Sequence, residues 1–212
     1  MVKMPVIVYD VETQFLANEI EGGWKNCFGM KVATCVCYSY SDDLYHFFGD
    51  TEDEHKKLLK FLNGCLAITF NGIQFDSQVL LGNDRKVKSN GYTSGTPFGE
   101  EIGFFNYDIN AEIWKSLFET KDCNEALKSA SNARQLHKKG VWNLDGIATA
   151  TLGGLIHKSG DGALAPQKFK DGKMRELFEY NLQDVRVEKA LFEFVKKYKY
   201  IINGNYDVLQ LK

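Results

Sequence analysis

The chain has 212 residues, of which 44% are hydrophobic and 25% are charged. This composition is typical of a folded globular domain with a substantial core, and it excludes a disordered tail. The 26 Lys and Arg residues nearly balance the 28 Asp and Glu residues, so the overall charge favours no class of partner. Apolar runs are too short for a signal peptide or a membrane span, so we expect a cytoplasmic, intracellular chain that does not bind a membrane.

The five cysteines are an odd number. They do not form a CxxC motif paired with a second CxxC or with an HxxxH motif. This pattern argues against a zinc site and against a disulfide framework. Cys35 and Cys37 share one face of a predicted strand, and we expect both to be free thiols in the core.

The first half of the chain predicts a sheet with flanking helices. Thr51, with Glu54 three residues later, forms a capping box that starts a helix, and Gly64 ends it. Two of the strands are joined by a short polar turn, which predicts a hairpin. Strands are expected at 5–13, 31–40, 44–48, 66–70 and 104–109, and a second helix at 76–81.

The second half is predominantly helical. Residues 83–103, just before it, are rich in Gly, Ser, Thr and Lys, which predicts a long flexible loop or insertion. A second loop is expected at 158–173, around Pro166. Together these elements predict one α/β domain over residues 1–212, with a mixed sheet whose first three strands are antiparallel. Helical patterns cover 113–120, 123–137, 143–154 and 173–198.

Four acidic residues are predicted to converge on this sheet. Asp10 and Glu12 are two residues apart in a strand and therefore point to the same face. Asp76 follows the fourth strand, and Asp184 lies on the side of the last helix that meets the sheet. Bare carboxylates at this density repel one another, and divalent cations relieve the repulsion. Oxygen ligands of this kind suit two Mg²⁺ or Mn²⁺ ions, which, about 3.5–4 Å apart, activate water for phosphodiester cleavage.

Three short motifs carry a family resemblance. The segments D-V-E at 10–12, N-G-I-Q-F-D at 71–76 and Y-N-L-Q-D at 180–184 resemble, in order, the three motifs of the DEDD family of 3′→5′ exonucleases, which have a ribonuclease H-like fold. Tyr180 resembles the DEDDy branch, because the histidine branch requires His at position 179. The nearest likeness is to the proofreading exonuclease domains of family-B DNA polymerases and their stand-alone relatives.

The resemblance implies a role for each acid. Asp10 would bridge both metal ions, and Glu12 and Asp184 would complete the site that activates water. Asp76 would hold the second ion, largely through water. The alternative for each acid is a solvated position at the end of a strand.

The same resemblance implies roles for three further residues. Tyr180 would orient the attacking water through its hydroxyl, and its alternative is an aromatic side chain on a buried helix face. Asn71 would hold the loop or contact the substrate. Phe75 would pack beside the terminal nucleotide, or within the core.

Other polar residues have two interpretations each. Asp108 is either a second acid near the metal site or, in our preferred interpretation, the N-cap of the following helix. Basic residues of the helical half could follow a phosphate backbone, with aromatic rings offering stacking faces, although a solvated surface is the simpler explanation for each. These residues are His137, Lys138, Lys139, His157, Lys158, Lys168, Lys170 and Lys173, with the rings of Tyr92, Phe98 and Trp142.

These observations predict a metal-dependent 3′→5′ exonuclease that acts on single-stranded DNA or RNA 3′ ends, with DNA favoured. The chain ends 28 residues after Asp184, so we expect a stand-alone enzyme, or one that serves a polymerase or another replication protein in trans. Two alternatives remain: a catalytically silent nucleic-acid-binding module of the same fold, and a ribonuclease H-like endonuclease.

Overall fold

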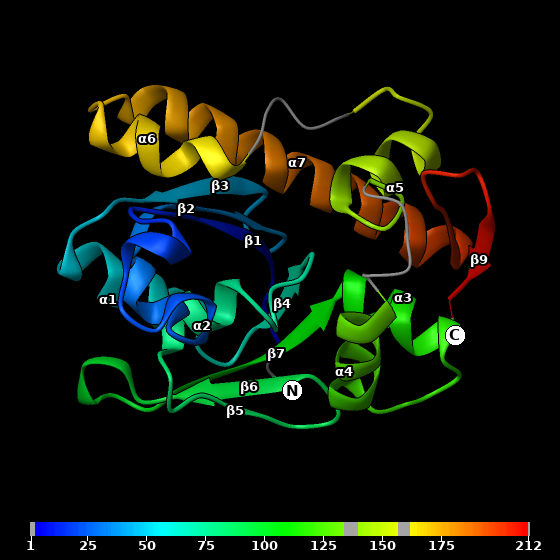
Figure 1. Ribbon diagram of the computed structural model, residues 1–212, viewed down its shortest axis with the longest axis horizontal. Helices are drawn as coiled ribbons and strands as arrows, with labels where there is room; N and C mark the ends of the chain where they lie inside the picture. The colour runs from blue at the N-terminus through cyan, green and yellow to red at the C-terminus, as the bar shows by residue number, and fades with distance from the viewer. Residues whose placement is uncertain (1–2, 134–139, 157–161, 212) are drawn as a thin grey trace.

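The computed structural model describes residues 3–133, 140–156 and 162–211. Its centre is a seven-stranded sheet with the strand order β3-β2-β1-β4-β7-β6-β5 (Figure 1). The α/β class and the mixed sheet flanked by helices are therefore confirmed. The strands are β1 (Val6–Thr13), β2 (Val32–Ser39), β3 (Leu44–Phe48), β4 (Leu66–Thr69), β5 (Lys86–Val87), β6 (Tyr92–Gly95) and β7 (Ile102–Asp108).

The sheet combines antiparallel edges with a parallel centre. β1, β2 and β3 pair antiparallel in sequence order, as predicted. β1 pairs parallel with β4, and β4 pairs parallel with β7. Because β1 extends past the end of β4, its carboxyl-terminal half has a backbone edge that β4 does not cover. The first acidic motif lies on this half.

One face of the sheet is covered by α1 (Glu52–Leu62) and α2 (Asp76–Leu81). The Thr51 hydroxyl accepts a hydrogen bond from the Glu54 N–H (3.2 Å) and so caps α1. The apolar side chains of both helices pack on the odd-numbered residues of β1, among them Ile7, Tyr9 and Val11. The free thiols of Cys35 and Cys37 lie buried in this layer, as expected.

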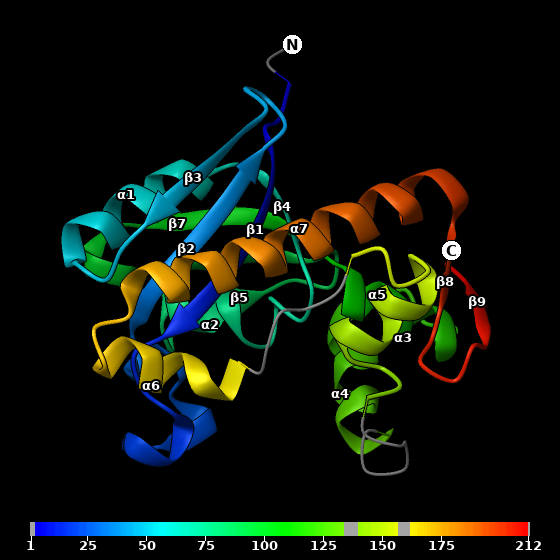
Figure 2. The ribbon, with the colours of Figure 1, turned by 90° about the horizontal axis from the view of Figure 1, so that it is seen from above.

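The opposite face is covered by α7 (Met174–Tyr198), which crosses β2, β1 and β4 and continues beyond the sheet beside α5 (Figure 2). Its buried residues Val185, Leu191 and Val195 pack on Val8 and Val36. This layer also contains α3 (Ile109–Leu117) and α5 (Leu144–Thr151). Even-numbered residues of β1 therefore face α7, and the acids of the first motif are even-numbered.

Residues 83–103 are not one long loop, contrary to the sequence-based prediction. They contain β5 and β6, which extend the sheet beyond β7. The buried residues of β6 are Thr93 and Gly95, so its alternation uses small and polar side chains rather than large apolar ones. An edge strand of this composition resembles a loop in sequence.

The predicted loop at 158–173 is also partly wrong, because residues Ala165–Lys170 form the short helix α6. Pro166 lies in its first turn, where the missing N–H costs nothing. α6 packs against the start of α7 (Figure 2). The remaining elements are α4 (Cys123–Ala133), β8 (Tyr200–Ile202), β9 (Val208–Gln210) and the 3-10 turns η1 (Ala17–Glu19), η2 (Gly23–Lys25), η3 (Cys27–Met30), η4 (Pro97–Gly99) and η5 (Gly162–Leu164).

Candidate metal centre

Three carboxylates meet between β1 and α7. One oxygen from each of Asp10, Glu12 and Asp184 lies within 4.8 Å of the other two. The two residues of β1 share a face because they are two positions apart, and Asp184 reaches them from the helix that covers that face. Glu12 and Asp184 are buried, and Asp10 is half-buried. Within the described ranges, this is the group of acidic, histidine and cysteine side chains that meets the spacing of a metal site.

Asn181 orients the carboxylate of Asp10, the half-buried member of this triad of acids. Its Nδ2 donates a hydrogen bond of 2.6 Å to Oδ2 of Asp10, and the residue is fully buried. Asn181 lies one helical turn before Asp184 and therefore on the same side of α7. The sequence analysis did not select it, although its place in Y-N-L-Q-D and its helical spacing were available as signals.

The buried polar atoms around the triad suit bound ions and their waters. Thr34 lies directly opposite Glu12 in the β1–β2 pairing, so its hydroxyl is on the same face. Thr34 Oγ1 and Asn181 Oδ1 are buried and have no hydrogen-bond partner among the described residues. Such atoms are rare in folded proteins unless water or a ligand satisfies them. Together with three hard oxygen donors, they fit a Mg²⁺ or Mn²⁺ site that keeps coordinated water.

Asp76 lies outside this group of three. It begins α2, on the opposite face of the sheet. Its Oδ1 accepts a hydrogen bond of 3.0 Å from the N–H of Val11, so it approaches the uncovered edge of β1 between the two acids of the first motif. The structure thus brings three of the four predicted acids together, and it places the fourth at the adjoining backbone.

The loop of the second motif is held in an unusual conformation. Asn71 has a positive φ of 72°, and its side-chain oxygen accepts a hydrogen bond of 3.1 Å from Asn110 Nδ2. A Cβ on Gly72 would overlap the Thr69 side chain, so only glycine fits there. The residues of N-G-I-Q-F-D therefore have a local structural role beside any contact with substrate.

Asp108 both caps α3 and anchors this loop. Its carboxylate accepts the N–H groups of Asn110 (3.0 Å) and Ala111 (3.2 Å) at the start of the helix, which confirms the N-cap interpretation. It also accepts those of Asn71 (2.8 Å) and Ile73 (3.0 Å). Burial raises the pKa of the Asp108 carboxyl to about 6, against the opposing effect of these four hydrogen bonds.

Tyr180 lies one turn before Asp184 on the same side of α7 and is buried. The Nζ of Lys168, from α6, lies 5.5 Å from the centroid of the tyrosine ring. This lysine therefore lies close to the site, whereas Lys170 pairs with Glu19. A cation so close to the ring places one positive charge beside the region where the resemblance expects the attacking water.

A second buried acid of α7 follows Asp184 by one turn. Glu188 is buried, and its Oε1 accepts a hydrogen bond of 3.1 Å from the N–H of Phe70, just after β4. It belongs to the anchoring of the strand end rather than to the group of three. Sequence reasoning missed it, although its spacing from Asp184 was a usable signal.

The aromatic and basic residues considered above are dispersed. Trp142 is half-buried and packs on Trp114, with 5.6 Å between the ring centroids. Tyr92 lies in β6 with Lys88 Nζ 4.9 Å from its ring centroid, and Phe98 is exposed. Lys173 lies 3.9 Å from Asp171. Residues His137, Lys138, Lys139, His157 and Lys158 lie outside the described residues.

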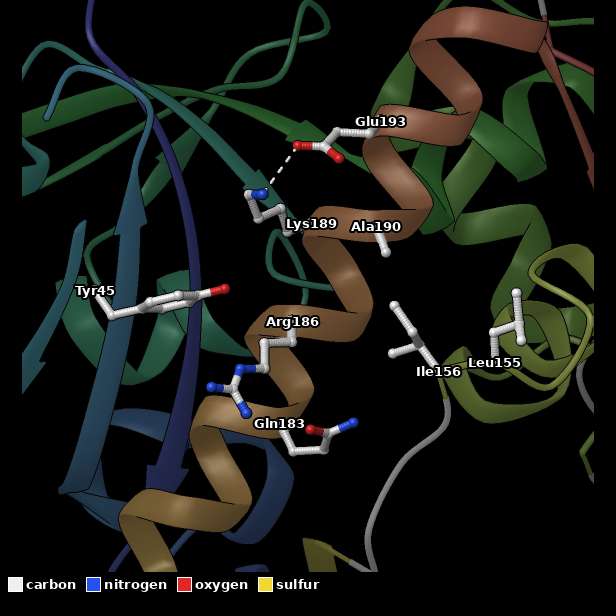
Figure 3. Close-up of a pocket in the computed structure, with 8 residues that line it drawn as sticks. All are labelled: Tyr45, Leu155, Ile156, Gln183, Arg186, Lys189, Ala190 and Glu193. Atoms are coloured by element: carbon white, nitrogen blue, oxygen red, sulfur yellow. Dashed lines mark ion pairs between the residues drawn. The ribbon is translucent and has the colours of Figure 1, made fainter. Parts of the chain in front are cut away.

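A cavity of about 450 Å³ lies beside α7 (Figure 3), and none of the three carboxylate residues lines it. Gln183 and Arg186 line it on the helix, and Leu155 and Ile156 line it from across. Gln183 precedes Asp184 in sequence, yet helical geometry turns the two side chains to different sides. This hollow is therefore separate from the carboxylate site.

Comparison with known proteins supports the fold. No family model matches the chain, and no curated protein matches it. Among solved structures, 87 chains match. One is the family B DNA polymerase from the hyperthermophilic archaeon Pyrobaculum calidifontis, with a TM-score of 0.58 and 16% sequence identity. The match covers 92% of this chain and 25% of the polymerase. At this identity the likeness establishes a shared fold, and the mixed sheet is consistent with the ribonuclease H-like fold.

Among the described residues, no helix combines the length and the apolar character that a membrane span needs.

Proposed function

We propose that this chain is a metal-dependent 3′→5′ exonuclease that hydrolyses phosphodiester bonds at single-stranded ends, with DNA favoured over RNA, and releases nucleoside 5′-monophosphates. The observation that carries the proposal is the meeting of Asp10, Glu12 and Asp184 within 4.8 Å. These residues come from the first and third motifs, which are 170 residues apart in sequence. The fold shared with a family B DNA polymerase supports the same conclusion.

Two Mg²⁺ or Mn²⁺ ions would be held by the three carboxylates, with Asp76 contributing through water. When bound, such ions lower the pKa of a coordinated water and stabilise negative charge on the leaving oxygen. The chain itself supplies the orientation of the ligands: Asn181 fixes the Asp10 carboxylate through its 2.6 Å hydrogen bond. Hydrogen bonds of this kind to a metal-binding carboxylate restrict it to the binding geometry.

Tyr180 would position the attacking water. Tyr180 and Asp184 are four residues apart on the same side of α7, so a water held between their side chains would be within reach of both. Lys168 beside the ring adds a positive charge that favours the approach of a phosphate. The tyrosine acts here by position, so its replacement by phenylalanine would reduce turnover and leave metal binding in place.

The alternatives are a silent binding module and an endonuclease. A module that only binds nucleic acid has no use for three mutually repelling carboxylates, which cost stability in the absence of a cation. An endonuclease would use the same ions. Action on behalf of a polymerase or another replication protein in trans is a proposal that follows from the exonuclease assignment.

A time course on matched linear and circular single strands tests the proposal. Linear DNA and RNA carry a 5′ label, and each reaction contains Mg²⁺, Mn²⁺ or EDTA. The proposal predicts a metal-dependent ladder that shortens from the 3′ end and an intact circle. In Asp10→Asn the cleavage of linear DNA and of linear RNA should be lost. Cleavage of the circle would indicate the endonuclease, and binding without cleavage would indicate the silent module. Asp84→Asn, which removes an exposed carboxylate, is the matched control.

A further inference from the structure

A cavity of about 650 Å³ lies next to the second motif. It is an open hollow, lined by residues of the 3-10 turns η2 and η3, the loop that begins at Asn71, α2 and α4. In Figure 1 the dark-blue segment that carries these turns lies beside α2. No charged side chain of the described residues lines this cavity. Three other cavities formed by described residues each include at least two charged side chains.

Trp24 forms an open wall of this cavity. It is 72% exposed, whereas Trp114 is 1% exposed. Its ring lies 6.0 Å from the ring of Phe75, centroid to centroid, at an interplanar angle of 57°. This separation leaves no room for a third ring between the two. Phe75 therefore contacts Trp24 directly, and the large exposed part of the indole is available for stacking.

Two glutamine amides lie in the same cavity and are held in place. Gln74 Nε2 donates to the Leu127 carbonyl oxygen (3.4 Å), and Gln78 Nε2 donates to the Gln74 carbonyl oxygen (2.5 Å). Neither amide oxygen accepts a hydrogen bond within the described residues. Each natural base offers at least one N–H donor on its Watson–Crick edge, so these oxygens match a base of any identity.

The cavity adjoins the carboxylates through the chain itself. Phe75 immediately precedes Asp76, whose Oδ1 accepts the N–H of Val11 between the two acids of β1. A ligand that stacks on Trp24 would thus lie close to the metal-binding residues. Because the described residues of its lining are aromatic and amidic, and none of them is charged, the cavity suits a base rather than a phosphate.

We propose that Trp24 is the stacking platform for a base among the last few nucleotides of the single strand, with Gln74 and Gln78 as acceptors for its polar edge. This inference rests on the proposed function for its ligand. Stacking on an indole is tolerant of base identity, so the site would hold the 3′ region of any sequence.

A double-mutant cycle between protein and substrate tests this inference. The affinity of the full chain for a labelled single-stranded oligonucleotide is measured in Ca²⁺, with an abasic site at the last, second-last or third-last nucleotide, or with none. On the intact strand, Trp24→Ala is expected to weaken binding by about 5- to 150-fold, since stacking on one aromatic ring contributes that much. Trp24→Phe should keep most of the affinity. Tyr206→Ala is the matched control, because Tyr206 is 77% exposed and lies between β8 and β9, far from this cavity.

The position of the abasic site decides the result. The inference predicts that at one position the loss caused by Trp24→Ala disappears, because the base that stacked is already missing. An equal loss at all three positions, no loss on the intact strand, or no binding of single strands by the wild type would each overturn it. Binding and cleavage are read separately: if stacking is found and no Mg²⁺-dependent or Mn²⁺-dependent cleavage occurs, the proposed catalytic function fails and the stacking site stands.

Discussion

Replacing Asp184 by Asn should stabilise the metal-free protein, although the residue is 1% exposed and most substitutions at buried positions destabilise. Asn has nearly the same shape and removes one of the three charges that meet within 4.8 Å. At that separation and an effective dielectric constant of about 20, each pair of charges repels by roughly 3.5 kcal/mol. Proton uptake and water penetration reduce this figure, so we expect a net gain of about 1–3 kcal/mol in the free energy of unfolding.

The assay is thermal unfolding in EDTA and in Mn²⁺. For a chain of this length a gain of 1–3 kcal/mol corresponds to a rise in Tm of about 2–10 °C. The wild type should gain about 2.7 kcal/mol from Mn²⁺ at roughly one hundred times its Kd, and Asp184→Asn should lose most of that gain. Asp84→Asn, at an exposed site, controls for the overall change in charge. A variant that is less stable than the wild type in EDTA and still gains the full Mn²⁺ shift would refute the reasoning.

Three further predictions concern the residues around the triad. Asn181→Ala removes the donor to Asp10 and should weaken Mn²⁺ binding by about 10- to 100-fold; calorimetry showing unchanged affinity would contradict this role. Gly72→Ala should destabilise the chain by about 1–3 kcal/mol, because its Cβ would overlap Thr69; an unchanged denaturation midpoint would count against the constraint. Asp108 has a pKa raised to about 6, above its unfolded value of about 3.9, so the native state holds the proton more tightly. Its contribution to stability is complete below about pH 4 and should decline by about 2–3 kcal/mol as the pH rises to 6. Asp108→Asn should lack this decline in denaturant titrations, and an identical pH profile would argue against it.

The acidic residues of the first and third motifs could be placed together from sequence because local periodicity determines their direction. Two residues in a strand point to one face, and the apolar stripe of α7 identifies the side that carries Asp184. Neither inference requires knowledge of the strand order. The meeting of these residues in the structure follows from α7 covering the even-numbered face of β1.

The position of Asp76 could not be obtained in the same way. α2 packs on the other face of the sheet, with its buried side chains among the odd-numbered residues of β1. Which face a helix covers is a property of the tertiary fold. The carboxylate therefore reaches the backbone edge of β1 rather than the group of three oxygens.

Three other features had no recognisable pattern in the sequence. Thr93 and Gly95 are buried in β6, yet neither is a large apolar residue, so the strand shows no apolar alternation in the sequence. Thr34 is opposite Glu12 because of the pairing register of β1 and β2. No tight turn joins these two strands, so the sequence does not reveal their register. Trp24 lies in a segment with 3-10 turns and no periodic pattern, and its partner Phe75 is 51 residues away in sequence.

Equilibrium binding of Mn²⁺ to the purified chain, measured as the loss of the free-ion signal in electron paramagnetic resonance, tests whether the three carboxylates bind divalent ions. We predict that the wild type and Asp84→Asn bind Mn²⁺ in competition with Mg²⁺, and that Asp10→Asn and Asp184→Asn bind at least tenfold more weakly, in line with about 1.4 kcal/mol or more per lost ligand. Equal binding by all four proteins would contradict the claim.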